Sequence, residues 1–422
     1  MVPQGTFAQR GAAWAQTVLR GPWLIARDTN NMSFTDIIDR RGTNCVKWDL
    51  VPEGVLPMWV ADMDFETAPC VMEAVRKRAG HGAFGYTAVP ARYYESVCNW
   101  FAEHHGWRPD PSWIIYCPGL VPAMSACVSA FTRPGDKVII MSPVYNCFFS
   151  SIRNYGCTVL DVPLLTVEEG GVPHYEIDFD GLERAASDPD AKLMLFCSPH
   201  NPAGRVWNRS ELERVGRICL EHGIVPVSDE IHCEFTQPGV EFMPFASVCP
   251  EFERACVTLN SPSKAFNIAG LQISNIIVAD PDLRARVNKA VNVNEICDVN
   301  PFGVVALQAA YTPEGFEWLQ GLNECIAGNY RRLVAAVARD LPWCRLYRLE
   351  GTYLAWLDCK ALGISTVEVE KSLTEVEKVR INNGVMYGQD GFIRINMACP
   401  PSMFNDGVRR IVRGLNRLKE QI

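Results

Sequence analysis

The amino-acid sequence predicts an α/β protein in which a large domain, built on a mostly parallel β-sheet, precedes a smaller α+β domain. Between about residues 119 and 280, short apolar runs alternate with segments of helical periodicity, as in buried parallel strands joined by helices. After about residue 300 this alternation gives way to a long helical pattern. The 422 residues are enough for two or three domains.

Six runs are predicted to form strands of the large sheet, because each is short, apolar and bounded by turn residues. They are residues 137–141, 158–162, 193–197, 225–228, 257–260 and 273–278. Between two of them, residues 210–222 carry apolar side chains at helical spacing.

The C-terminal part has its own predicted elements. Residues 313–340 form a long helical region, with Gly321 and Gly328 as candidate interruptions. Strands are predicted at residues 352–357 and 392–396, and a closing helix near residues 405–419.

These patterns give the expected domain boundaries. Residues 1–31 carry scattered arginines and no long apolar run, and Met32 opens a plausible protein start, so we expect an upstream extension and no secretory signal. Residues 32–62 are expected to belong to the small domain. Residues 63–300 should form the large domain, and residues 301–422 the small C-terminal domain.

Composition disfavours several classes of protein. The net charge of −8 and the lack of a Lys/Arg run argue against a nucleic-acid surface, and no apolar run reaches the length of a membrane span. The 17 cysteines include no Cys-x-x-Cys pair, which disfavours a zinc site or a disulfide framework. We therefore expect a cytoplasmic protein with buried thiols and no metal, nucleic-acid or membrane partner.

Three predicted strands end in polar residues. The strand at 193–197 leads to Asn201, the strand at 225–228 to Asp229, and the strand at 257–260 to Ser261, Ser263 and Lys264. In an open α/β sheet, ligands bind beyond the carboxyl ends of the strands. An amide, an acid and a lysine at three such ends predict one shared pocket.

These side chains suit pyridoxal phosphate (PLP). That cofactor needs a lysine for a covalent Schiff base, a carboxylate at its pyridine nitrogen, a donor near its phenolic oxygen and a cradle for its phosphate. Lys264, Asp229 and Asn201 are candidates for the first three roles.

The phosphate cradle has a separate candidate at Pro118-Gly119, a turn before a helical segment. Gly119 permits close backbone approach, and free N–H groups at a helix start attract an anion. A Pro-Gly turn before a helix is usually only a cap, so this signal depends on its context. The hydroxyl groups of Ser261 and Ser263 are candidates to complete the cradle.

Two further side chains are candidates for the same pocket. Tyr145 follows another predicted strand and offers a ring to stack on the pyridine, with a packed rim tyrosine as the alternative. Arg394 has apolar neighbours in a predicted strand, and its planar fork suits bidentate capture of a substrate α-carboxylate. An ordinary structural ion pair is the alternative for Arg394.

From about Met32 to its C-terminus, the sequence resembles fold-type I PLP enzymes of the aspartate aminotransferase superfamily. Within them it is most similar to the MalY/PatB-type C–S lyases, also called cystathionine β-lyases. The stretches Trp-Val-Ala-Asp-Met-Asp-Phe at 59–65 and Asp-Glu-Ile-His at 229–232 are specific to this branch. The motifs that carry the resemblance are residues 39–49, 57–65, 84–87, 142–145, 199–202, 228–232 and 263–267.

The resemblance implies a large, mostly parallel seven-stranded sheet with a smaller α+β domain, and roles for named residues. It makes Lys264 the covalent anchor of PLP and Asp229 the partner of its pyridinium nitrogen. It places Asn201 at the phenolic oxygen, Tyr145 on the ring and His232 in the cofactor pocket. The residues implied at the phosphate are Gly119, Leu120, Val121, Ser261 and Ser263. Those implied at the substrate are Ala61, Asn201, Tyr353 and Arg394. Tyr86 is implied to reach the phosphate of a neighbouring subunit, so we expect a homodimer with shared active sites.

Two positions separate this chain from typical aminotransferases. His232 stands where those enzymes usually have a tyrosine, and Gln272 where an arginine usually contacts the phosphate; both differences fit the lyase branch. Ala265 and Leu120 depart from the hydroxyl and β-branched residues expected there, in roles that the backbone can fill.

The resemblance implies β-elimination of a thiol from cystathionine or cysteine-type L-amino acids, giving pyruvate and ammonia. Lys264 would act as the base, and Lys264 or Tyr86 would protonate the leaving sulfur. Trp59, Tyr353 and residues 292–300 are expected to select the leaving group. The main alternative is an aminotransferase on the same scaffold; a PLP-sensing regulator is disfavoured by the acidic charge and the lack of room for a DNA-binding module.

Overall fold

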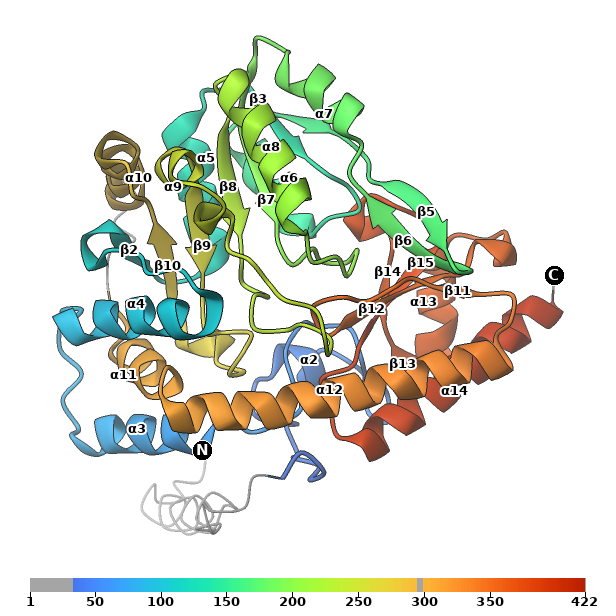
Figure 1. Cartoon of the computed structure of the whole chain (residues 1–422). Helices are drawn as coiled ribbons and strands as arrows, with labels where there is room; N and C mark the ends of the chain where they lie inside the picture. Colours follow the sequence, from blue (N-terminus) through green and yellow to red (C-terminus); the bar gives the residue numbers. More distant parts are fainter. Residues whose placement is uncertain (1–32, 294–298, 422) are drawn as a thin grey trace, which may run out of the picture. The chain divides into compact units, whose positions relative to one another are not determined.

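The computed structural model describes residues 33–293 and 299–421, and a seven-stranded mixed sheet organises the larger part of this chain (Figure 1). In spatial order its strands are β2 (Ile114–Cys117), β10 (Ser274–Ile277), β9 (Val257–Asn260), β8 (Val225–Asp229), β7 (Ala191–Cys197), β3 (Lys137–Ile140) and β4 (Thr158–Asp161). In this sheet only β10 runs in the direction opposite to the other strands. The predicted large, mostly parallel sheet is confirmed.

The strands of this sheet are nearly continuous apolar runs because helices cover both faces. In β7, Leu193 and Leu195 pack in one core layer, while Met194 and Phe196 pack in the other. The first layer contains α5 (Leu120–Phe131), α6 (Asn146–Asn154) and α10 (Pro281–Val293). The second contains α4 (Ala91–His105), α7 (Phe179–Ala186), α8 (Arg209–Glu221) and α9 (Pro250–Ala255).

Strand β2 and the hairpin β5 (Leu165–Glu169)–β6 (Val172–Glu176) are elements that the sequence patterns do not predict. Strand β2 has only four residues and directly follows a 3-10 turn at Pro111–Trp113. Most of β5 is exposed, so it does not form an apolar run. Short or exposed strands give weak periodic signals.

The C-terminal part is built on a four-stranded antiparallel sheet. Its strands, in spatial order, are β11 (Arg345–Leu346), β12 (Leu354–Asp358), β15 (Phe392–Asn396) and β14 (Asn382–Asn383). The remaining helices are α2 (Val46–Asp49), α3 (Pro69–Gly80), α11 (Pro301–Ala310), α12 (Pro313–Asp340), α13 (Thr366–Glu375) and α14 (Pro401–Glu420). Strand β1 (Leu56–Pro57) pairs with β13 (Val379–Arg380), which joins the N-terminal segment to the C-terminal part.

Helix α12 is continuous over 28 residues, so the candidate interruptions at Gly321 and Gly328 are wrong (Figure 1). A Cβ at Gly321 would lie 2.7 Å from the ring of Phe34, so this glycine makes room for an aromatic side chain against the helix. A Cβ at Gly328 would meet only the ends of the Arg331 and Arg332 side chains. Glycine in a helix weakens it without necessarily breaking it.

The described residues from Phe34 onward belong to one compact unit. The expected extension at residues 1–31 lies outside the described residues, and the boundaries expected after residues 62 and 300 stay a prediction.

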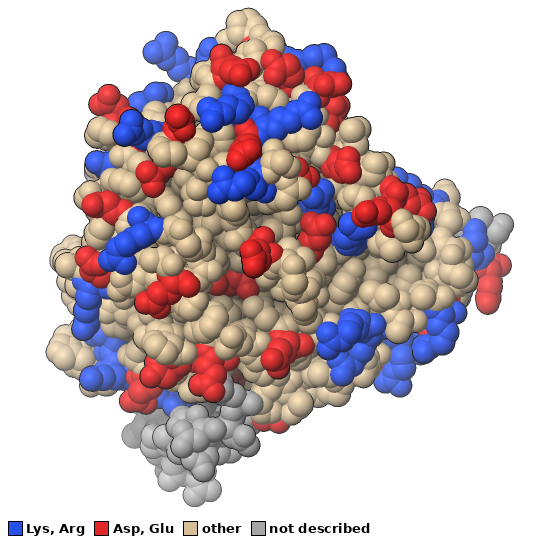
Figure 2. Space-filling model, viewed as in Figure 1, with Lys and Arg blue, Asp and Glu red and all other residues tan. Residues whose placement is uncertain are grey.

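None of the described helices is long and apolar enough to cross a membrane. Acidic and basic side chains are intermixed over most of the face shown in Figure 2.

Gly328→Ala is expected to raise the free energy of unfolding by about 0.5–1 kcal/mol, because alanine favours the helix. Gly321→Ala is expected to lower it by about 1–3 kcal/mol, since its methyl group would displace the Phe34 ring. Thermal unfolding of the two purified variants measures this difference. A Gly321→Ala protein as stable as Gly328→Ala would contradict the packing argument.

Candidate active site

A cavity of about 350 Å³ opens where β7, β8 and β9 end. It brings together most of the site residues that the sequence predicts. These are Ala61, Gly119, Leu120, Val121, Tyr145, Asn201, Asp229, His232, Ser263, Lys264 and Arg394. Parallel strands direct their carboxyl ends to one edge of a sheet, so residues distant in sequence meet there.

Lys264 lies in the turn after β9 and is partly exposed to the cavity. Its Nζ atom donates a hydrogen bond to the Ala61 carbonyl oxygen at 2.6 Å. Removal from bulk water and, to a smaller extent, the nearby Arg394 charge lower the pKa of Lys264 to about 8, against the opposing charges of Asp62 and Asp229. A neutral amine is the form that attacks a carbonyl carbon.

Asp229 is the last residue of β8 and is buried. Its Oδ1 atom accepts the backbone N–H of Ile231 at 3.2 Å. Burial raises the pKa of Asp229 to about 7. In the part of the chain that the structure describes, no Lys, Arg or His forms an ion pair with Asp229, so its charge is available to a cationic group in the cavity.

Arg394 lies at the centre of β15 and is buried beneath the cavity. It donates hydrogen bonds to the Asn201 side-chain oxygen at 3.1 Å and to the Trp59 carbonyl oxygen at 2.7 Å. The guanidinium lies over the Tyr387 ring at 4.8 Å, and its Nε has no partner among the described residues. Because Arg394 lines the cavity, its guanidinium suits an anionic ligand there.

Helix α5 begins at the cavity wall with Gly119 as its N-cap. Gly119 has a φ of 154°, a conformation that L side chains rarely adopt. The N–H groups in the first turn of a helix have no acceptor within the helix and carry the positive end of its dipole. Leu120 and Val121 therefore present backbone donors suited to a phosphate.

His232 and Tyr145 close the cavity on two other sides. His232 is buried, and burial lowers its pKa well below the ordinary value, so the imidazole is neutral. Tyr145 is the N-cap residue of α6, and burial raises the pKa of its phenol, which stays protonated. Both rings can contact an aromatic ligand without adding charge.

Comparison with known proteins identifies the family of this chain. Residues 53–411 match the family described as aminotransferase class I and II. The chain belongs to this family. Cystathionine β-lyase PatB of Bacillus subtilis (strain 168) is 41% identical over 392 residues, covering 91% of this chain and 100% of PatB. Protein MalY of Escherichia coli (strain K12) is 31% identical over 395 residues, covering 92% of this chain and 99% of MalY.

Among solved structures, a PLP-bound C–S lyase from Staphylococcus hominis is similar, with a TM-score of 0.84 and 34% identity. The match covers 91% of this chain and 98% of that lyase. The resemblance to MalY/PatB-type enzymes is therefore confirmed.

The cavity of this family member fits PLP in three respects. The free N–H groups at the start of α5 suit its phosphate. The buried Asp229, without a cationic partner among the described side chains, suits its protonated ring nitrogen. The Lys264 amine, with its lowered pKa, suits its aldehyde.

Three predicted site residues do not line the cavity. Ser261 is buried, and its hydroxyl donates to the Ile273 carbonyl at 2.5 Å. Tyr353 is also buried, and its hydroxyl donates to the Ala61 carbonyl at 2.9 Å, so it lies behind the wall that Ala61 forms. Tyr86 is fully exposed, and the expected contact with a second subunit stays a prediction. Of residues 292–300, positions 294–298 lie outside the described part.

Several cavity residues carry no signal in the sequence. Asn382, Met386 and Tyr387 come from a turn-rich segment of the C-terminal part. The Asn382 side chain donates to the Trp59 carbonyl at 2.9 Å and to the Tyr387 hydroxyl at 2.8 Å. The Asn-Asn-Gly sequence at 382–384 indicates only a turn, so its place in the site depends on tertiary contacts.

His105, Cys233 and Glu234 place three potential metal-ligating atoms within 4.8 Å of one another. Their closeness has a simpler cause, because Glu234 Oε1 pairs with His105 at 3.0 Å and accepts from Trp100 at 2.7 Å. The Cys233 thiol lies 3.5 Å from the same oxygen. We assign this cluster to a buried hydrogen-bond network.

The reactivity of Lys264 is expected to rise with pH and level off above about pH 8, because its neutral fraction follows a lowered pKa. At pH 7 about one Lys264 in ten is neutral, against about one in 2,500 for an ordinary lysine. Trace labelling of the cofactor-free protein with acetic anhydride at several pH values, read by mass spectrometry, measures this. Lys77, an exposed lysine of α3, is the internal reference. Labelling of Lys264 that still rises steeply well above pH 8 would contradict the effect of burial.

Proposed function

We propose that this protein is a PLP-dependent carbon–sulfur β-lyase. It eliminates a thiol from cystathionine or cysteine-type L-amino acids and yields pyruvate and ammonia. The observation that carries the proposal is the meeting of Lys264, Asp229 and Arg394 in one cavity, in a chain 41% identical to a cystathionine β-lyase.

When bound, PLP supplies an aldehyde that captures an amine and a ring that delocalises negative charge. Lys264 holds this group and, once its amine is released, takes the proton from the substrate Cα atom. Its lowered pKa leaves a useful fraction of the amine neutral near pH 7. Asp229 keeps the ring nitrogen protonated by offering a buried negative charge.

The substrate α-carboxylate is held by Arg394, which lines the cavity. Asn201 accepts from Nη1 and the Trp59 carbonyl from Nη2, so both partners orient the guanidinium plane. A fixed plane favours bidentate binding of a carboxylate over a single contact. The neutral His232 leaves Arg394 and Lys264 as the cationic groups of the cavity wall.

The leaving sulfur needs a proton, for which Lys264 and Tyr86 are the two candidates. Lys264 lies in the cavity and carries the proton taken from Cα. Tyr86 is fully exposed and is proposed to serve a second subunit in a homodimer. We also propose a cytoplasmic location, which the free thiols of the described cysteines support.

Purified enzyme given L-cystathionine or L-cysteine is expected to release pyruvate over many turnovers without an added keto acid. Lys264→Ala is expected to lower this rate by at least about 10³-fold, since it removes the base and the covalent anchor. Coupled pyruvate detection measures the rate. Product formed only when a keto acid is supplied would instead establish the aminotransferase alternative.

The shared active site has a test of its own. Mixing Lys264→Ala subunits with Tyr86→Ala subunits places both lesions in one site of the mixed dimer and leaves the other site intact. The mixture is expected to recover about one quarter of wild-type activity after subunit exchange. Recovery of no activity from two separately inactive variants would contradict a site built from two chains.

A further inference from the structure

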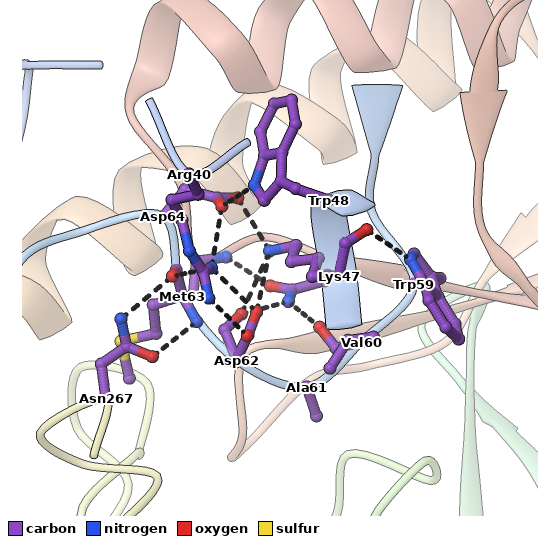
Figure 3. Close-up of polar contacts among 12 residues, drawn as sticks. Arg40, Lys47, Trp48, Trp59, Val60, Ala61, Asp62, Met63, Asp64 and Asn267 are labelled. Atoms are coloured by element: carbon purple, nitrogen blue, oxygen red, sulfur yellow. Dashed lines mark hydrogen bonds and ion pairs between the residues drawn. The ribbon is translucent and has the colours of Figure 1, made fainter. Parts of the chain in front are cut away.

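The segment from Trp59 to Asp64, called here the 59–64 segment, contains no helix or strand. Its carbonyl groups are nevertheless held by side chains from distant parts of the chain, among them Arg40, Lys47 and Asn267 in Figure 3. Trp59 accepts from Arg394 and Asn382, Val60 from Asn396, Ala61 from Lys264 and Tyr353, Asp62 from Lys47 and Asn396, and Met63 from Arg40 and Asn267. Side-chain donors thus satisfy the backbone carbonyls of this segment, as the hydrogen bonds from a neighbouring strand do in a β-sheet.

An ionic cluster joins Asp62 and Asp64 of this segment to Arg40 and Lys47 (Figure 3). Lys47 Nζ lies 2.7 Å from Asp64 Oδ2 and 3.5 Å from Asp62 Oδ1. Arg40 lies 2.8 Å from Asp62 and 3.1 Å from Asp64. With two positive and two negative groups, the cluster is electrically balanced.

Lys47 is the buried cation of this cluster. Burial alone lowers the pKa of Lys47, but Asp64 and Asp62 together raise it above the ordinary value, so the amine is charged. Its short helix, α2, follows a turn whose Gly42 and Cys45 N–H groups donate to the Asp49 carboxylate, each at 2.9 Å. The motif at 39–49 therefore builds a support for Lys47.

The cluster is electrically linked to the Lys264 amine. The groups that face Lys264 are Asp62, Asp229, Arg394, Cys147 and His232. Asp229 is reserved for the cofactor ring in the proposed function, which leaves Asp62 as the second carboxylate near the amine. The charge that Lys264 senses from Asp62 depends on whether Lys47 and Arg40 balance it.

We propose that Lys47 is a positioning residue for Lys264. Through Asp62 and Asp64 it fixes the Ala61 carbonyl that receives the Lys264 amine, and it balances the carboxylate charge beside that amine. This inference rests on the proposed function, because Lys264 is the residue that holds PLP. The inference gives the motif at residues 39–49, which lies outside the cavity, a role in positioning Lys264.

Lys47→Met removes the charge and keeps the apolar stem, leaving the cluster with a net negative charge. The pH midpoint of the absorption band of the lysine-bound cofactor is expected to rise by about one unit, because the protonated form is stabilised. Asp62→Asn leaves a net positive charge and is expected to lower the midpoint. The kcat of Lys47→Met is expected to fall by about tenfold, with a smaller change in KM, because a misplaced base affects the chemical step.

Two controls separate this role from general loss of an ion pair. Lys137→Met removes a lysine that pairs with Asp188 at 2.6 Å and Asp190 at 3.6 Å on the large sheet, outside the cavity. It is expected to leave the midpoint and kcat unchanged. Lys47→Arg keeps the charge and is expected to restore the wild-type midpoint.

If Lys47→Met does not fold, Lys47→Gln, which keeps a polar side chain without the charge, replaces it and is expected to raise the midpoint in the same way. Unchanged midpoints, or shifts in the same direction in Lys47→Met and Asp62→Asn, would overturn the positioning role. Those results would leave the proposed function intact, since the wild-type cofactor band would persist and disappear in Lys264→Ala. Absence of that band from wild-type protein reconstituted with PLP would instead overturn the proposed function.

Discussion

The hydrogen bond from Lys264 Nζ to the Ala61 carbonyl joins two segments 203 residues apart, and the rest of the site is arranged around it. The 59–64 segment contributes a wall of the cavity but has no secondary structure to hold it. Lys264, Arg394 and Tyr353 each donate to its carbonyls. These side chains orient the segment, and the segment in turn fixes where their polar atoms lie.

Burial of charge is the second constraint on this site. The same loss of water raises the pKa of Asp229 and lowers that of Lys264, because burial disfavours the charged form of each. Arg394 is held by Asn201 and by a backbone carbonyl. A ligand carrying a cationic ring nitrogen, an aldehyde and anionic groups complements all three side chains.

The topology of the large sheet explains why those groups meet. Strands β7, β8 and β9 are parallel neighbours, so Asn201, Asp229 and Lys264 follow adjacent carboxyl ends. Arg394 arrives from β15 of a different sheet, and Ala61 from a segment tied to that sheet through Asn396. The cavity therefore lies where the large sheet meets the C-terminal part, a common place for ligand sites.

The sequence by itself determined the main strands of the large sheet, the long helix α12, and the polar strand ends that contain Asn201, Asp229 and Lys264. Those features depend on local periodicity and on the direction of parallel strands, which a single sequence records. It did not reveal β2, the continuity of α12 at Gly321, the place of Tyr353 behind Ala61, or the support that Lys47 gives to the 59–64 segment. Only the tertiary structure decided these, because each depends on packing or on a side-chain hydrogen bond between segments far apart in the chain.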